Sequence, residues 1–261
     1  MKKLMSTDKN VIRLEPFGPA QTGMQEMQLN PEDFQSELPV QHVHVYYEDT
    51  TLGLSVGVWD TTAMQESFGP YPGDEFMWVL EGNVCMIDGD GNETLINEGE
   101  SFCIRNAIPV SWKQTGFLRK FFMTYTDPDS PAPKIASAGG GVQLLDPLVL
   151  SRGLKLMDTT APFVIEGEAP QQHDNVLFTN DKGNMFVGMW DSTAFESQMR
   201  PFPCYEFVQL LEGEITITED DGKINLFKAG DAFFIPMGTV CRWKTTEYVK
   251  KFYSILDPGA G

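Results

Sequence analysis

Two glutamates, Glu75 and Glu206, occupy the same place in two similar segments, EFMWVLEG and EFVQLLEG. A lysine follows each of them at the same distance, as Lys120 and Lys251. A lysine buried among apolar strands needs a partner for its charge. The glutamate is a candidate partner, and such a pair either only stabilises its domain or forms the polar floor of a pocket.

Further residues near these glutamates could do chemistry. Tyr71 lies four residues before Glu75, and a Tyr–Glu pair can perform acid–base catalysis when the pKa of the carboxyl group is raised. Arg200 precedes Glu206 and could bind a carboxylate through two hydrogen bonds. The sequence also allows an Arg200–Glu206 bridge that only closes the domain.

The four cysteines, Cys85, Cys103, Cys204 and Cys241, are not equivalent positions of a repeat, so they predict free thiols in a reducing cytoplasm. Cys204 and Cys241, together with Glu206, could form a soft metal site or an activated nucleophile. Buried cysteine is more often inert core. The candidate catalytic residues are therefore Glu75, Tyr71, Glu206 and Cys241.

The matching segments belong to a long internal repeat. Residues 11–122 align with residues 142–253 without a gap at a shift of 131 residues, and 33 of the 112 aligned positions are identical. Chance would give roughly one identity in fifteen, so the chain reads as a duplication. We predict an N-terminal domain over 11–130, a linker over 131–141 and a C-terminal domain over 142–261.

Each repeat is a series of short β-forming segments separated by turn residues. In the first repeat we expect strands over 43–47, 54–59, 76–80, 84–87, 93–96, 101–104, 110–113 and 118–126. Short strands separated by Gly- and Pro-containing turns predict an all-β sandwich or barrel.

The composition excludes several classes of function. The formal net charge is −18, which disfavours nucleic acid and anionic membranes as partners. No apolar run is long enough to span a bilayer, and the first residues do not form a signal peptide. A homodimer is an arrangement that the sequence leaves open.

Both repeats resemble the cupin superfamily, in particular the (S)-ureidoglycine aminohydrolase-type domain. The matching motifs are Trp-Asp at 59–60 and 190–191, the glutamate segments, Gly-Glu-Ser-Phe at 99–102, Gly-Asp-Ala-Phe at 230–233, and Pro-Met-Gly at 236–238. The resemblance implies two tandem jelly-roll barrels, a bicupin.

The metal ligands usual in cupins are missing. The glutamate position is kept, but the three histidine positions are Gly69, Tyr71 and Val110 in the first repeat. They are Arg200, Phe202 and Cys241 in the second. We therefore expect no metal and no other cofactor. His42 recurs as His173, which predicts one structural hydrogen bond made twice, although a displaced metal site is the alternative.

The resemblance also implies which side chains face the barrel interiors. The expected ligand-binding residues are Tyr71, Glu75, Trp112, Lys120, Arg200, Glu206, Cys241, Trp243 and Lys251. We expect the second barrel to be the one better suited to a ligand, held between Arg200, Glu206 and Trp243.

The resulting hypothesis is a metal-independent bicupin that binds or transforms a small polar metabolite containing a carboxylate or nitrogen. One alternative is a metal-dependent hydrolase with atypical ligands. The other is a non-catalytic sensor or scaffold.

Overall fold

A computed structural model describes residues 9–129 and 141–260. They fall into two compact units, unit 1 with residues 14–129 and 141–145 and unit 2 with residues 9–13 and 146–260. Apart from Gly141, the predicted linker lies outside the described residues. Relative to the expected boundaries, residues 11–13 pack with unit 2 and residues 142–145 with unit 1.

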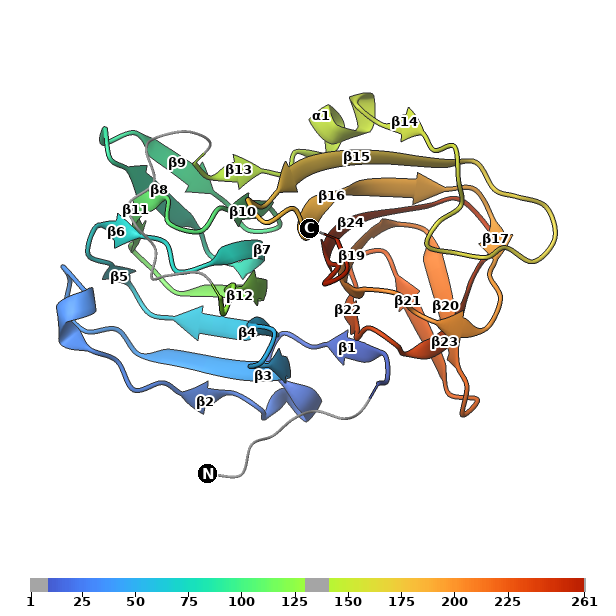
Figure 1. Cartoon of the computed structure of the whole chain (residues 1–261). Helices are drawn as coiled ribbons and strands as arrows, with labels where there is room; N and C mark the ends of the chain where they lie inside the picture. Colours follow the sequence, from blue (N-terminus) through green and yellow to red (C-terminus); the bar gives the residue numbers. More distant parts are fainter. Residues whose placement is uncertain (1–8, 130–140, 261) are drawn as a thin grey trace. The chain divides into compact units, whose positions relative to one another are not determined.

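Unit 1 consists of two antiparallel sheets (Figure 1). Its strands are β2 (Gln25–Glu26), β3 (Gln41–Asp49), β4 (Leu54–Thr61), β5 (Met64–Gln65), β6 (Gly69–Pro70), β7 (Asp74–Glu81), β8 (Val84–Asp88), β9 (Glu93–Ile96), β10 (Ser101–Ile104), β11 (Pro109–Gln114), β12 (Leu118–Tyr125) and β13 (Gln143–Leu144). The larger sheet has the order β13-β10-β7-β12-β4-β3-β2. The smaller has the order β5-β11-β8-β9, with β6 also paired to β11.

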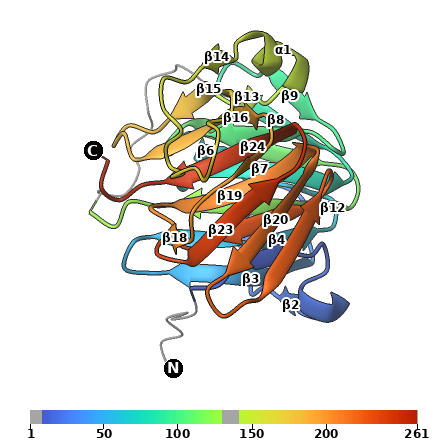
Figure 2. The same cartoon turned by 90° about the vertical axis from the view of Figure 1, so that its right-hand side faces the viewer.

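Unit 2 has the same strand order. Its strands are β1 (Ile12–Leu14), β14 (Lys155–Leu156), β15 (Gln172–Thr179), β16 (Met185–Ser192), β17 (Phe195–Glu196), β18 (Arg200–Pro201), β19 (Tyr205–Glu212), β20 (Glu214–Glu219), β21 (Ile224–Lys228), β22 (Ala232–Ile235), β23 (Val240–Thr245) and β24 (Val249–Leu256). The larger sheet runs β1-β22-β19-β24-β16-β15-β14. The smaller runs β17-β23-β20-β21, with β18 on β23, and Figure 2 shows β23 beside β20.

The all-β prediction is confirmed. Besides two 3-10 turns, η1 (Pro19–Gln21) and η2 (Pro31–Asp33), the described residues contain only one short α-helix, α1 (Pro147–Arg152). None of the helices among the described residues is long and apolar enough to cross a bilayer.

The glutamate segments form the central strands β7 and β19, each paired on both sides. Phe76, Met77 and Val79 are fully buried, as expected of a strand with two apolar faces. Gly82 ends β7 with φ +82°, and a side chain there would collide with the carbonyl oxygen of Phe117. Glycine is therefore the residue that this turn requires.

Strands β1 and β13 occupy equivalent positions in the two repeats, and they are exchanged between the units. β1 comes from the first repeat but joins a sheet of unit 2, and β13 comes from the second repeat but joins a sheet of unit 1. β1 pairs with β22 in unit 2, whereas β13 pairs with β10 in unit 1. The β1 segment is anchored by an N–H of Val11 that donates to the buried Glu219 at 3.0 Å. An ion pair of 2.9 Å joins Arg13 to Asp231. Residues 11–13 therefore complete the larger sheet of unit 2.

Deleting residues 1–13 tests this assignment. We expect faster hydrogen exchange at the amides of β22 that donate to β1, because they would become a sheet edge open to water. The amides of β10 are the internal control, because their partner β13 is kept. Unchanged protection of β22 would contradict the assignment.

Candidate functional site

Unit 1 contains a cavity of about 330 Å³ between its two sheets. Aromatic side chains form much of its wall, and polar groups cluster among them. The lining residues are Met27, Gln41, Val43, Trp59, Glu66, Tyr71, Pro72, Glu75, Trp112, Lys120, Phe122 and Thr124. Four of the predicted site residues, Tyr71, Glu75, Trp112 and Lys120, are thus brought together here.

The strand pairing explains why Glu75 and Lys120 meet. Glu75 on β7 stands opposite Thr124 on β12, the neighbouring strand. Lys120 lies four residues before Thr124, so the side chains share one face of the sheet. The Lys120 ammonium lies 2.7 Å from Glu75 Oε1, and both side chains are buried. The predicted Glu–Lys pairing is confirmed.

Aromatic rings and a tyrosine complete the environment of this ion pair. Lys120 Nζ lies 4.8 Å from the ring centroid of Trp112 and 5.2 Å from that of Trp59, within cation–π range. The Tyr71 hydroxyl donates to Glu75 Oε2 at 2.6 Å. Burial and the negative charge of Glu75 hold the pKa of Tyr71 well above its usual value. Tyr71 therefore stays a hydrogen-bond donor at neutral pH.

Glu66, just after β5, is a second carboxyl group in the cavity wall, and the sequence analysis missed it. Burial raises the pKa of Glu66 to about 7; Lys120 acts in the opposite direction, while Glu75 and Asp33 raise it further. Among the described residues, no hydrogen bond to this carboxyl group is formed. The sequence feature that could have identified Glu66 is the repeat, because the equivalent residue in unit 2 is Ser197 and the carboxyl group is therefore specific to unit 1.

Unit 2 repeats the ion pair without the open space. Lys251 Nζ lies 2.5 Å from Glu206 Oε1 and 4.8 Å from the ring centroids of both Trp190 and Trp243. A pocket lined by Phe163, Phe202 and Trp243 has a volume of only about 20 Å³, the scale of a single water.

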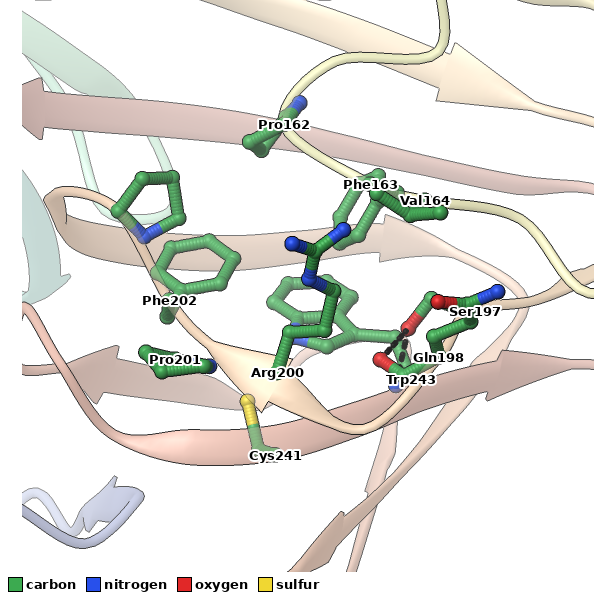
Figure 3. A pocket seen from close by; sticks show the side chains of 11 residues that line it. Pro162, Phe163, Val164, Ser197, Gln198, Arg200, Pro201, Phe202, Cys241 and Trp243 are labelled. Atoms are coloured by element: carbon green, nitrogen blue, oxygen red, sulfur yellow. Dashed lines mark hydrogen bonds between the residues drawn. The ribbon is translucent and has the colours of Figure 1, made fainter.

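Phe163 fills the corresponding space. Its ring centroid lies 5.1 Å from those of Trp243 and Phe195, and 6.3 Å from that of Phe202. Figure 3 shows the rings of Phe163, Phe202 and Trp243 close together at the small pocket. The residue at the position of Phe163 in the first repeat is Glu32, which is exposed. A bulky apolar side chain thus closes unit 2 where unit 1 is open.

The expectation of a ligand between Arg200, Glu206 and Trp243 needs correction. Glu206 binds Lys251, whereas Arg200 is exposed and forms no ion pair within the described residues. Arg200, Trp243 and Cys241 line the small pocket (Figure 3), but Glu206 does not. The hydrogen bond from Lys251 and the volume of Phe163 leave no room for the expected clamp.

The candidate nucleophile Cys241 is also disfavoured. Burial raises the pKa of the Cys241 thiol to about 12, so it is protonated at neutral pH, and the reactive species of cysteine is the thiolate. All four cysteines are free, as predicted.

Comparison with known proteins finds a family model that matches part of unit 2. Residues 179–253 match the EutQ-like cupin domain. This match lies within unit 2 and covers less than half of the chain. No curated protein matches the chain in sequence.

Solved structures share the cupin-like jelly-roll fold over nearly the whole chain. A protein of unknown function from Pseudomonas syringae pv. tomato is 25% identical, with a TM-score of 0.76, covering 95% of this chain and 100% of the other. A putative dioxygenase from Nostoc punctiforme is 14% identical, with a TM-score of 0.61 and coverages of 97% and 85%. A cupin 2 conserved barrel domain protein from Leptotrichia buccalis is 14% identical, with a TM-score of 0.56 and coverages of 85% and 91%.

The side chains do not fit the metal that cupins usually hold. The retained carboxylates of Glu75 and Glu206 each bind a lysine ammonium instead. Nδ1 of His42 contacts Asp60 at 2.9 Å, and Nδ1 of His173 contacts Asp191 at 2.7 Å, so the predicted repeated hydrogen bond is confirmed. Over the described ranges, no three His, Cys, Asp or Glu side chains are grouped as metal ligands would be.

Replacing Phe163 tests whether its side chain fills the interior of unit 2. Phe163→Ala should leave a cavity beside Trp190 and Trp243 and destabilise the protein by about 3–5 kcal/mol, the usual cost of removing a buried phenylalanine. Urea unfolding measures the change. Phe68→Ala is the control, because Phe68 is 46% exposed. Equal losses for the two variants would contradict a packing role for Phe163.

Proposed function

We propose that the cavity of unit 1 binds a small polar metabolite that carries a carboxylate, and that Lys120 is the group that binds it. The observation that carries this proposal is an ammonium group at the wall of a 330 Å³ cavity between two tryptophans. An ammonium group has three donors. One donates to Glu75 and one to the sulfur of Met77, which leaves a third for a ligand.

The dimensions and lining of the cavity favour a compact ligand with one flat apolar part. A volume of 330 Å³ lies at the lower end of the range for small-molecule pockets. Trp59, Trp112 and Phe122 supply flat apolar surface, and the polar groups lie beside them. A carboxylate on a single ring meets both requirements. In this proposal the filled unit 2 acts as a scaffold, and binding needs no metal.

The two lysines provide a matched experiment with benzoate as probe, measured by isothermal titration calorimetry. We expect Lys120→Gln to weaken benzoate binding by about 10–100-fold, since a hydrogen bond to a charged group contributes about 1.5–3 kcal/mol. Lys251→Gln loses the same buried ion pair in unit 2 and should leave benzoate affinity unchanged.

Two controls make the outcome specific. Benzamide has the shape of benzoate without its charge and should bind weakly to all variants. Circular dichroism verifies that both variants are folded, since leaving a buried carboxylate unpaired is destabilising. Equal benzoate affinity in Lys120→Gln and the unmodified protein would refute the role of Lys120.

A further inference from the structure

The backbone fixes Glu66 at the cavity wall. Its N–H donates to the carbonyl of Trp112 at 2.8 Å, and its own carbonyl accepts from the Ser111 hydroxyl at 2.6 Å. A β-bridge joins it to Phe34 on the other side. These contacts come from β11 and from the segment after η2, so the start of the side chain has little freedom to turn away from the cavity.

The charges around Glu66 are unbalanced. Lys120 is the positive group that acts on it, and Glu75 and Asp33 are the negative ones. Tyr71 is held neutral. With Glu66 ionised, the carboxylates of Glu66 and Glu75 outnumber the ammonium of Lys120 inside the cavity. An anionic ligand would add a further negative charge where water screens it poorly.

Unit 2 supplies the contrast. Where unit 1 has the cavity, Glu66 lines it. Where unit 2 is filled by Phe163, the equivalent residue is Ser197, whose hydroxyl accepts from the backbone N–H of Trp243 at 2.9 Å. Both units have the ion pair, but only unit 1 has the 330 Å³ cavity and a carboxyl group at this position. The presence of Glu66 therefore correlates with the cavity and not with the ion pair.

We propose that Glu66 is protonated when the cavity holds an organic acid, so that this site binds monoanionic acids together with a proton. The inference rests on the proposed function. An acid that arrives neutral breaks its own O–H bond and gives the proton to the carboxylate of Glu66. An acid that arrives as its anion leaves Glu66 to take the proton from the buffer. In both cases one O–H bond forms on Glu66, the ligand anion lies against Lys120, and no electrons are transferred.

Proton and anion then bind cooperatively, and this coupling is reciprocal. The anion raises the proton affinity of Glu66, and the protonated Glu66 raises the affinity for the anion. Because free Glu66 titrates near pH 7, the coupling falls in the neutral range. Benzoate affinity should therefore drop by about five- to tenfold between pH 6 and pH 8 if bound benzoate raises the pKa of Glu66 by at least one unit.

The test is calorimetry of benzoate binding at pH 7 in two buffers of different ionisation enthalpy. The unmodified protein should take up a fraction of a proton per benzoate, and Glu66→Gln should take up none and show a flat affinity from pH 6 to pH 8. The exposed Glu98 supplies the control Glu98→Gln, which should behave as the unmodified protein. Lys120-dependent binding with the same proton uptake in Glu66→Gln would overturn this inference and leave the proposed function standing. No benzoate binding by the unmodified protein would overturn both.

A measurement without ligand isolates Glu66 itself. The folded protein keeps the proton of Glu66 up to about pH 7, whereas the unfolded chain releases it near the ordinary value for glutamate. The unfolded state is therefore increasingly favoured as the pH rises through this window. Glu66→Gln should raise the melting temperature at pH 8 and change it little at pH 4. An equal shift at both pH values would show that Glu66 does not titrate as the inference requires.

Discussion

A buried ion pair between neighbouring strands is the constraint on which both units depend. Removing two charges from water costs several kcal/mol per ion, and only close contact and further polar partners offset that cost. The pairs Glu75–Lys120 and Glu206–Lys251 satisfy this with contacts of 2.7 and 2.5 Å. Two tryptophans flank each ammonium. Moving either strand by one residue would turn one charge to the other face of the sheet, so the pair also fixes the strand register.

The same ion pair serves two different interiors because the surrounding loops differ. In unit 2 the segment before β15 carries Phe163 into the space over the pair, and stacked Phe202 and Trp243 close it further. In unit 1 the equivalent position is the exposed Glu32, and Tyr71 replaces Phe202. The hydroxyl of Tyr71 then binds Glu75. Apolar filling in one unit and polar lining in the other give the same strand order a packed interior in unit 2 and a cavity in unit 1.

The regular parts of the structure were predictable from the sequence. Alternation and turn residues predicted the strands, and the retained lysine predicted a partner for each glutamate. Which unit has an open cavity could not be predicted. The side chain that fills unit 2, Phe163, lies in an irregular segment without periodicity, so its position could not be inferred from the sequence. Glu66 was missed for a related reason: it follows a two-residue strand, and its environment is created by residues distant in sequence. Within the repeat, Glu66 stands out only as a difference, because the equivalent residue is Ser197.

An ammonium group at the carboxylate changes what the site can do. A metal ion accepts electron pairs from several ligands at once, whereas the ammonium of Lys120 only donates hydrogen bonds and holds a single positive charge. With one donor on Glu75 and one on Met77, it can bind one anionic oxygen and stabilise negative charge there. A proton acceptor on the same wall complements this, because an acid that loses its proton becomes the anion that the ammonium attracts. In the proposed site Glu66 and Lys120 therefore complement each other, because one holds the proton and the other binds the anion that remains.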